Sequence, residues 1–411
     1  MVADDVRGVD AAGFAHFVVM TNLLIVTTLY PNAVQFRHGI FVEARLRRLL
    51  ATGQFTATVI APVPWFPSAS ARFGQYAKYA KVPRMEIRQG IEVYHPRYLV
   101  IPKVGMVLTP LLLAWSVWRE AWRLRRKGKR WDLLDAHYYY PDGVSAALVA
   151  RLLRLPLTIT ARGSDINVLP AFKLPRKMIG WAAMRTRTSI AVSDALRRAM
   201  INLGHDADKI EVWRNGVDLD LFRPIPKSKA RERLGLTRTT LCSVGNLIEL
   251  KGHDLVIRAL EHLPDCDLII VGDGELRDSL RQLTESLGLA SRVRFLGTVR
   301  QEELVEIYSA ADALVLASSR EGMPNVVLEA MACDTLVVAT KVGGIPEVLQ
   351  GEDAGVLIET HDASHIADAV SNLFEHYPLP GVTRKCAGRF SWDSTIEGLS
   401  ATLHRAAQEV A

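Results

Sequence analysis

Cysteine is scarce in this sequence, and a long apolar run is missing. The 411 residues contain four cysteines without a CxxC pair or zinc-type spacing, and they are Cys242, Cys266, Cys333 and Cys386. This pattern argues against a disulfide-stapled secreted scaffold and indicates reduced thiols in a cytoplasmic chain. The longest apolar run, Val107–Trp118, contains Pro110 and is too short to span a bilayer.

The N-terminus also lacks the features of a signal peptide. Residues 1–19 carry Asp4, Asp5 and Asp10, and no basic region precedes an apolar run. Because Met20 stands immediately before the first strand-like segment, we interpret 1–19 as a disordered lead or a misassigned start.

The chain also has no large excess of positive or negative charge, except in one segment. The 50 Lys and Arg residues exceed the 44 Asp and Glu residues by six. Arg119–Arg130 holds seven bases and one acid, Glu120, and so carries the excess of the whole chain. A local basic patch on a near-neutral body, without a stacking platform or recognition motif, argues against nucleic-acid binding.

Short β-branched runs alternate with amphipathic segments, which predicts βαβ units and parallel sheets. Strands are expected at 22–29, 56–61, 133–137, 157–160, 189–193, 241–245, 267–271, 293–296, 313–317, 336–339 and 355–358. Helices are expected at 41–51, 111–126, 144–153, 254–263, 275–288, 302–310, 326–332, 346–349 and 393–410.

The pattern predicts an α/β protein of two tandem Rossmann-like, doubly wound parallel-sheet domains facing a cleft. The alternation of strand-like and amphipathic segments stops at an Asn-Gly turn followed by two prolines, which indicates a linker. The expected divisions are an N-terminal domain 20–214, a linker 215–235, a C-terminal domain 236–390 and a final helix 391–411.

The segment EGMPNVVLE follows an expected strand and offers two carboxylates, Glu321 and Glu329. Since proline suits a first helical turn, the helix is expected to begin at Pro324–Asn325, with free N–H groups at Gly322, Met323 and Asn325. Carboxylates suit hydroxyl-rich ligands such as a hexose and a ribose diol. A loop acid followed by an ordinary surface acid on a helix is the alternative.

The segment SVGNLIELKGHDLVI places Lys251 and Gly252 before a helix expected to open at His253 or Asp254. An ammonium beside a helix N-terminus can bind a diphosphate, although a solvated lysine is the alternative. The P-loop pattern is missing. Gly272 lies at a strand end and could line the cleft.

Three loops of the first half offer further candidates. Gly39 lies between the first strand and first helix, where a glycine permits close approach to a phosphate or simply makes a turn. His137 ends a strand, as a hydrogen-bond donor or a structural residue, and Asp142 is expected to cap the next helix. Arg162 and Asp165 reach the same edge in TARGSD, where Asp165 could also be a turn residue.

No metal site is expected. The Asp218-Leu219-Asp220 triplet has the D-x-D pattern of some metal-dependent sugar transferases. It follows the Asn-Gly turn of the linker, however, and no second ligand cluster is nearby.

Together these motifs resemble the family-4 retaining glycosyltransferases of the GT-B type, also called group 1 glycosyl transferases. The resemblance runs from about residue 22 to the C-terminus and is strongest between Ser243 and Leu349. Its second-half motifs are VGNLIELKGHDLVI, LIIVGDGELR, RVRFLGTV, ADALVLASSREGMPNVVLEAMAC and VVATKVGGIPEVL. Its first-half motifs are FRHGIFVEAR, HYYYPDG and TARGSD.

The resemblance implies roles for the matching residues. Glu321 is expected to contact the donor sugar, Glu329 the ribose, and Lys251 the leaving diphosphate. His137 is expected to contact the sugar near the reacting centre, and Gly39 to lie near the diphosphate. It also implies retention of configuration, no metal or other cofactor, and a last helix that crosses back to the first domain.

This sequence departs from the family pattern at four positions. Asn246 stands where many members have arginine, so either Lys251 acts with Arg320 or another base, or activity is lowered. Arg162 replaces a histidine, which affects the acceptor side. Asp334 and Leu336 stand where glycine and proline are usual.

The segment before residue 127 has two side-chain stripes at helical spacing. One stripe is aromatic, with Trp115, Trp118 and Trp122, and the other is basic, with Arg119, Arg123 and Arg126. The stripes are typical of a membrane-surface helix, or of a core-packed face below a solvated one. The resemblance favours an anionic membrane as the partner, because many members glycosylate lipid-linked acceptors.

The sequence therefore predicts an enzyme that moves a sugar from a nucleotide-sugar, a UDP-sugar, to a glycan or lipid-linked acceptor. It would act in cell-surface polysaccharide or glycolipid biosynthesis, in the cytoplasm or on the cytoplasmic face of the inner membrane. The alternatives are a nucleotide-sugar epimerase on the same fold and a catalytically degenerate scaffold in a polysaccharide-assembly complex.

Overall fold

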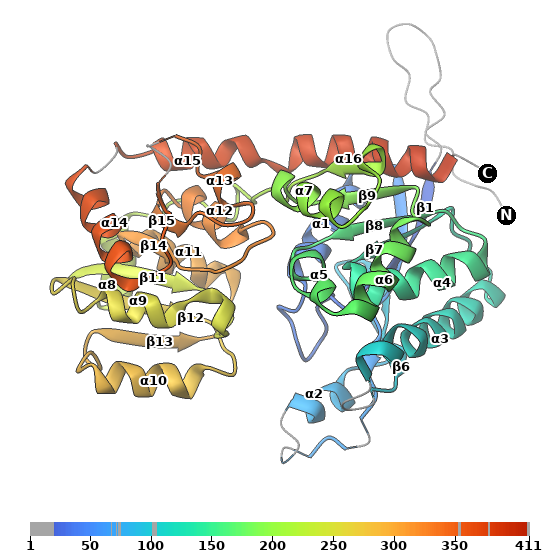
Figure 1. The fold of residues 1–411 in the computed structure, drawn as a ribbon, viewed down its shortest axis with the longest axis horizontal. Coiled ribbons are helices and arrows are strands. Elements are labelled where there is room, and N and C mark those ends of the chain that lie inside the picture. The colour runs from blue at the N-terminus through green and yellow to red at the C-terminus, as the bar shows by residue number, and fades with distance from the viewer. Residues whose placement is uncertain are drawn as a thin grey trace, which may run out of the picture. The chain divides into compact units, whose positions relative to one another are not determined.

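The protein is described by a computed structural model covering residues 20–66, 68–70, 72, 75–100, 105–351, 355–376 and 379–408. The expected lead at residues 1–19 lies outside these ranges. Residue contacts divide the chain into two compact units, each with its own helices and strands (Figure 1). Unit 1 comprises Met1–Thr160, Pro170–Ser189 and Gly398–Ala411, and unit 2 comprises Ala161–Leu169 and Ile190–Glu397.

The first sheet has eight strands in the order β10-β9-β8-β7-β1-β2-β5-β4. The run from β8 to β5 is parallel, and β4 is an antiparallel edge strand. The strands are β1 (Thr21–Val26), β2 (Phe55–Ile60), β4 (Met85–Arg88), β5 (Ile91–Tyr94), β7 (Leu133–His137), β8 (Leu157–Ala161), β9 (Thr188–Ala191) and β10 (Ile210–Val212). A separate short pair joins β3 (Val63–Pro64) and β6 (Arg97–Tyr98).

The helices of unit 1 are α1 (Ile40–Ala51), α2 (Gln75–Lys81), α3 (Gly105–Arg126), α4 (Val144–Leu153) and α6 (Lys173–Ala183). Helices α3 and α4 pack against each other (Figure 1). One face of α3 is buried through Leu113, Val117, Ala121 and Leu124, which recur at three- and four-residue intervals. That spacing leaves the opposite face of α3 in solvent.

Unit 2 is built on a six-stranded sheet in the order β13-β12-β11-β14-β15-β16, in which all neighbouring strands are parallel. The strands are β11 (Thr239–Val244), β12 (Cys266–Val271), β13 (Val293–Gly297), β14 (Ala313–Leu316), β15 (Leu336–Thr340) and β16 (Val356–Ile358). The helices are α5 (Ser164–Asn167), α7 (Asp194–Asn202), α8 (Lys227–Leu234), α9 (His253–Ala259), α10 (Arg277–Ser286), α11 (Gln301–Ala310), α12 (Asn325–Ala332), α13 (Ile345–Val348), α14 (Ala363–Glu375) and α15 (Val382–Ala387).

Helices cover both faces of this sheet (Figure 1). Helices α9, α10 and α14 form one group, and α8, α11, α12 and α15 form the other. Both faces of the central strands are therefore buried, which is why β14 is an uninterrupted apolar run, Ala-Leu-Val-Leu. Loops at the carboxyl ends of the strands remain available for a site.

Several sequence-based expectations need correction. Helix α3 begins at Gly105, six residues before the expected start, and includes Pro110. The strand expected at 22–29 ends at Val26, because Thr27 and Thr28 turn their polar groups to Asp142. Strands β4 and β5 and the helices α6, α7, α14 and α15 are not indicated by the sequence pattern.

The expected linker is partly helical. Helix α8 occupies its last third, with Ala230 buried and Lys227 and Arg231 both paired to Asp312 at 2.8 and 3.1 Å. These contacts tie α8 to α11 and to β14, so this part of the segment belongs to the body of unit 2. Contacts also assign Ala161–Leu169 and the residues from Ile190 to unit 2, a division that differs from the expected boundary at 214.

The last helix described is α16 (Trp392–Gln408), whose residues from Gly398 onward belong to unit 1. There the ring of His404 stacks on Phe55 at 4.4 Å, and its Nδ1 lies 2.9 Å from the Thr21 hydroxyl. In the part of the chain described, no helix has both the length and the apolar character needed to cross a bilayer.

Candidate active site

Lys251 and Glu321, seventy residues apart in sequence, form an ion pair in unit 2. Lys251 Nζ lies 2.6 Å from Glu321 Oε1, and the Ser318 hydroxyl donates to the same oxygen at 2.7 Å. Lys251 follows β11 and Glu321 follows β14, and these strands are parallel neighbours. Since the carboxyl ends of parallel neighbours share one edge, the pairing follows from the order of the strands.

Close backbone packing holds both side chains of this pair in place. Gly252 has φ 62°, and a Cβ added there would lie 2.1 Å from the carbonyl oxygen of Ala317. Gly343 has φ 54°, and its added Cβ would lie 1.9 Å from the carbonyl oxygen of Glu321. Any side chain at either position would displace the loop that carries Lys251 or Glu321, so both positions require glycine.

Beside the ion pair lies a cavity of about 300 Å³. Its lining residues, all of unit 2, are Asn167, Ala195, Leu196, Ser319, Arg320, Glu321, Val342 and Gly343. Arg320 is exposed and makes no ion pair with any described residue. The cavity therefore presents one free guanidinium and one carboxylate that is already paired to Lys251.

Helix α12 begins one residue after Pro324, as expected from the sequence. The N–H groups of Gly322 and Met323 have no hydrogen-bond partner among the described residues, in agreement with a donor-rich loop. The Asn325 N–H was expected to be free as well, and that expectation is wrong, because it donates to the Met323 carbonyl at 3.1 Å. The Met323 side chain is buried.

Glu329 lies on α12, one turn into the helix. It accepts a hydrogen bond from a tyrosine that no sequence motif indicates. The hydroxyl of Tyr308, on α11, donates to Glu329 Oε2 at 3.2 Å. Burial, together with the neighbouring carboxylate, raises the pKa of Tyr308 well above its usual value. Tyr308 therefore stays protonated and orients the carboxylate of Glu329.

Arg162 is linked to the α12 loop through a chain of side chains. Its Nη1 donates to Asn215 Oδ1 at 3.1 Å, and Asn215 Nδ2 donates to Asn325 Oδ1 at 3.1 Å. From the sequence, Asn215 is expected only as the first residue of the linker. The structure thus brings a residue expected on the acceptor side together with one expected on the donor side, within unit 2.

Asp165 is fully buried and binds its own loop. Its carboxylate accepts from the backbone N–H groups of Arg162 and Gly163 at 3.0 and 2.7 Å. These bonds fix the turn in which Gly163 packs against Gly322. Asp165 therefore acts as a turn residue, which was the alternative interpretation of it.

His137 stands at the carboxyl end of β7 in unit 1, as expected. It is almost completely buried, and its Nε2 lies 3.4 Å from Asp135 Oδ2. Asp135 also accepts from the Thr158 hydroxyl at 2.7 Å. The side chains of His137 and Asp135 therefore lie beside each other at the carboxyl end of β7.

Asp142 does not cap α4, contrary to expectation. The N-cap of α4 is Gly143, without a side-chain hydrogen bond. The buried carboxylate of Asp142 instead accepts from the backbone N–H of Thr28 at 2.6 Å and from the Thr27 hydroxyl. Asp142 therefore fixes the loop after β1.

Gly39 is the N-cap of α1, with φ 71°. The glycine permits a close approach to the backbone of Leu29, since a Cβ added at Gly39 would lie 2.2 Å from the Leu29 carbonyl oxygen. Gly272, at the end of β12, makes a similar approach to the Gly245 carbonyl. Asn246, next to Gly245, is exposed.

Asp334 occupies a left-handed turn after α12, with φ 62°, where glycine is the ordinary residue. Its carboxylate accepts from the N–H of Gly381 at 2.7 Å, and so joins this turn to the start of α15. The substitution is explained by this added link within unit 2.

The D-x-D segment forms a turn. Asp218 Oδ1 accepts from the N–H groups of Asp220 and Leu221 at 3.2 and 3.1 Å. Among the residues described, no group of three or more His, Cys, Asp and Glu side chains is placed to hold a metal ion.

The aromatic and basic stripes both lie on α3. Trp115 and Trp122 are 63% and 49% exposed, and Trp118 is half-buried between them, with ring centroids 5.2 and 6.2 Å away. Arg119 and Arg126 are exposed, whereas Arg123 binds Glu120. Trp115 and Trp122 are therefore exposed, whereas Trp118 is only partly so, and the membrane-surface interpretation of this helix stays a prediction.

Comparison with known proteins matches both parts of the chain to sugar transferases. The model of "Glycosyl transferases group 1" matches residues 224–387, and that of "Glycosyltransferase Family 4" matches residues 44–221. The "Putative teichuronic acid biosynthesis glycosyltransferase TuaC" of Bacillus subtilis is 32% identical over 368 residues, covering 86% of this chain and 89% of the relative. The chain belongs to glycosyltransferase family 4.

Two further similarities bear on this family 4 glycosyltransferase. A D-inositol 3-phosphate glycosyltransferase of Mycobacterium leprae is 33% identical over 303 residues, covering 67% of this chain and 69% of the relative. HepE of Anabaena, solved in complex with UDP, has a TM-score of 0.70 and 21% identity, covering 94% of this chain and all of HepE. The two mainly parallel sheets of the glycosyltransferase, each with its helices, are those of the GT-B fold.

Proposed function

We propose that this glycosyltransferase transfers a sugar from UDP-sugar to a glycan or lipid-linked acceptor, with retention of configuration and without a metal. The proposal of a nucleotide-sugar donor is supported mainly by the Lys251–Glu321 ion pair, which lies beside a cavity with a free arginine. HepE, a protein of the same fold, has been solved with UDP and with UDP-glucose.

The cations of this site suit a departing diphosphate. Lys251 is already held within 2.6 Å of Glu321, and Arg320 has no carboxylate partner among the described side chains. In the proposed reaction Lys251 and Arg320 stabilise the negative charge that develops on the leaving group, the largest electrostatic task of the step. Arg320 thereby supplies the charge that Asn246 lacks.

The carboxylates suit the hydroxyl groups of the donor. Glu321 would accept from hydroxyls of the sugar, and Glu329, oriented by Tyr308, would accept from the ribose. The Gly322 and Met323 N–H groups add donors to the same loop. The roles of His137 and Gly39 in unit 1 stay predictions from the family resemblance.

The acceptor part of the proposal is cell-surface polysaccharide or glycolipid biosynthesis. TuaC carries teichuronic acid biosynthesis in its name, which supports an acceptor of this kind. We propose that the chain acts in the cytoplasm, bound peripherally to the cytoplasmic face of the inner membrane through α3. The exposed Trp115 and Trp122 beside Arg119 and Arg126 support this placement.

A nucleotide panel tests the donor claim. Thermal unfolding is followed with UDP, GDP and ADP and with the matching sugar nucleotides, and UDP is expected to raise the Tm most. Glu329→Ala and Lys251→Ala should abolish the increase. Wild-type protein that none of the nucleotides stabilises would contradict the proposal and favour the scaffold alternative.

Incubation with UDP-sugar in the absence of acceptor separates the transferase from the epimerase. A transferase leaves the sugar nucleotide intact or hydrolyses it slowly to UDP and a sugar of unchanged anomeric configuration. Conversion to a second sugar nucleotide would instead identify an epimerase.

A further inference from the structure

Unit 1 contains a groove that is separate from the donor site described in unit 2. The groove has a volume of about 1150 Å³ and lies between α3 and the segment from β4 to β6. Its charged lining residues are six cations and one carboxylate: Arg84, Arg97, Arg119, Arg123, Arg126, Lys127 and Glu120. An excess of this size in one groove selects for an anionic ligand.

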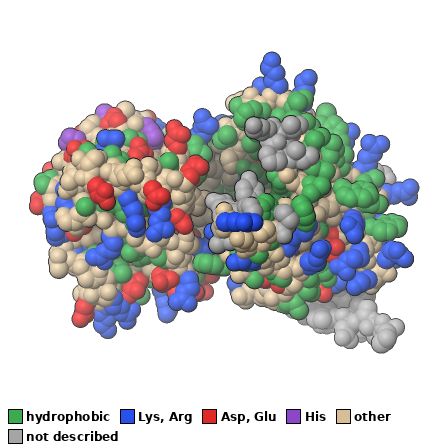
Figure 2. All heavy atoms as spheres, turned by 90° about the horizontal axis from the view of Figure 1, so that it is seen from below, with side chains coloured by type: hydrophobic (Ala, Val, Ile, Leu, Met, Phe, Trp, Pro, Cys, Tyr) green, Lys and Arg blue, Asp and Glu red, His purple; other side chains and the backbone are tan. Residues whose placement is uncertain are grey.

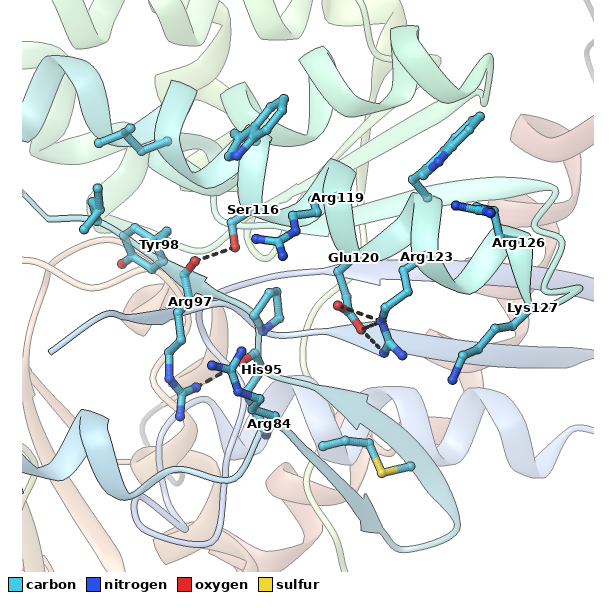
Figure 3. Close-up of a pocket in the computed structure, with 16 residues that line it drawn as sticks. Arg84, His95, Arg97, Tyr98, Ser116, Arg119, Glu120, Arg123, Arg126 and Lys127 are labelled. Atoms are coloured by element: carbon cyan, nitrogen blue, oxygen red, sulfur yellow. Dashed lines mark hydrogen bonds and ion pairs between the residues drawn. The ribbon is translucent and has the colours of Figure 1, made fainter. Parts of the chain in front are cut away.

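The cations come from two walls (Figure 3). Arg84 and Arg97 extend from the strand side, whereas Arg119, Arg123 and Lys127 extend from α3. A ligand lying in the groove is therefore contacted from both sides.

Most of this charge is not neutralised by the protein. In the part of the chain described, the side chains of Arg84, Arg119, Arg126 and Lys127 make no ion pair, and Glu120 binds Arg123. Four cations without a counter-ion remain available to a phosphate.

Arg97 is held in place by the backbone. Its guanidinium donates to the carbonyl oxygens of His95, at 2.9 Å, and Val82. Burial lowers the pKa of Arg97, and the neighbouring Arg84 lowers it further. Neither Arg84 nor Arg97 makes an ion pair with a carboxylate of the described residues, so this end of the groove carries net positive charge.

The rim of the groove is apolar. Trp115, Trp122 and Leu99 are between 49% and 63% exposed, and all three line it. Figure 2 views the molecule from below Figure 1 and shows many hydrophobic and basic side chains close together on its right half, which is unit 1. A free phosphate or a soluble glycan leaves these side chains in water, whereas a lipid covers them.

We propose that this groove is a binding site for the phosphate-bearing headgroup of a membrane lipid, with the start of its apolar chain against Trp115 and Leu99. The phosphate lies between Arg84 and Arg97 on one wall and Arg119 on the other. The proposal rests on the peripheral membrane binding proposed above and makes it specific, since the lipid occupies a defined groove instead of a diffuse charged surface.

The first test measures binding of the whole chain to vesicles of phosphatidylcholine containing phosphatidylglycerol, by co-sedimentation. Arg84→Gln combined with Arg119→Gln is expected to weaken binding about 25-fold, since each base near an anionic surface contributes about fivefold. The matched control, Arg151→Gln with Arg176→Gln, removes two exposed cations of α4 and α6 outside the groove and should weaken binding less than about twofold. Equal losses in the two variants would overturn the proposal, although membrane binding itself would stand.

The second test uses monomeric dihexanoyl phosphatidylglycerol, with glycerol 3-phosphate as the ligand that lacks the chains. Saturable binding of the lipid, lost in Arg84→Gln with Arg119→Gln and at least about tenfold weaker for glycerol 3-phosphate, is expected. Equal affinity for both ligands, or binding of a soluble polyanionic glycan in place of the lipid, would overturn the proposal. The Tm increase with UDP is measured on every variant, so that failure of the donor site is seen separately.

Discussion

Replacing Lys251 with methionine should destabilise unit 2 even without nucleotide. The substitution keeps most of the side-chain volume but removes the ammonium that lies 2.6 Å from Glu321. The Glu321 side chain is only 10% exposed, and Lys251 is 22% exposed. Lys251→Met therefore leaves a nearly buried carboxylate with the Ser318 hydroxyl and no cation.

The magnitude follows from this intermediate burial. Removing one partner of a fully buried pair costs about 3–5 kcal/mol, and an exposed pair contributes about 0–1 kcal/mol. For the Lys251–Glu321 pair we expect a loss of about 2 kcal/mol. In a domain of this size, that loss lowers the Tm by about 4–8 °C.

A double-mutant cycle with Glu321→Gln isolates the pair. The double variant has no orphan charge, so it should be more stable than Lys251→Met alone. Arg320→Met is the matched control, because Arg320 lines the same cavity without an ion pair to any described residue, and its Tm should change little. Additive effects in the cycle, or an equal loss in Arg320→Met, would refute the assignment of an ion pair.

Three further predictions test the surroundings of the site. Tyr308→Phe removes the hydrogen bond to Glu329 and should weaken the binding of UDP about fivefold, as measured by calorimetry. The affinity for pyrophosphate should stay unchanged. An equal loss of affinity for both ligands would indicate a structural effect. Gly163→Ala, at φ 139° and with its Cβ 3.1 Å from the facing loop, should cost about 1–3 kcal/mol in urea unfolding, whereas Gly180→Ala, which meets nothing within 4 Å, should not destabilise. Burial lowers the pKa of His253 from 6.5 to about 4 in the folded protein. Between these two pH values the unfolded state binds the proton and the folded state does not. The free energy of unfolding should therefore fall as the pH is lowered from 6.5 to 4. His253→Gln should flatten this fall, and an unchanged slope would contradict the assignment.

The sheet of unit 2 could be predicted closely from the sequence. Strands β11, β12, β14 and β15 were expected within two residues of their observed bounds. Parallel strands buried on both faces are continuous apolar runs, and their ends are marked by glycine or by charged loop residues.

The part of unit 1 between residues 63 and 98 could not be predicted in the same way. Strand β4 is an edge strand of mixed composition, Met-Glu-Ile-Arg, and β3 and β6 have two residues each. Their pairing depends on neighbours distant in sequence, so no local period identifies them.

The candidate site shows the same division. The sequence alone indicated Lys251, Glu321 and Glu329, because a lysine before a helix and two acids around a proline are local patterns. It could not indicate Tyr308 or Asn215, since a tyrosine in an amphipathic helix and an asparagine in a turn have no distinguishing context.

The sequence by itself determined the two α/β units, the family and the loops that carry the candidate site, because apolar periodicity and short motifs are local properties of the chain. Only the tertiary structure decided which loops meet. The order of the strands brings Lys251 to Glu321, and the packing of α3 on one face leaves its tryptophans and arginines beside Arg84 and Arg97. Contacts between distant segments depend on the whole fold, and no stretch of sequence contains them.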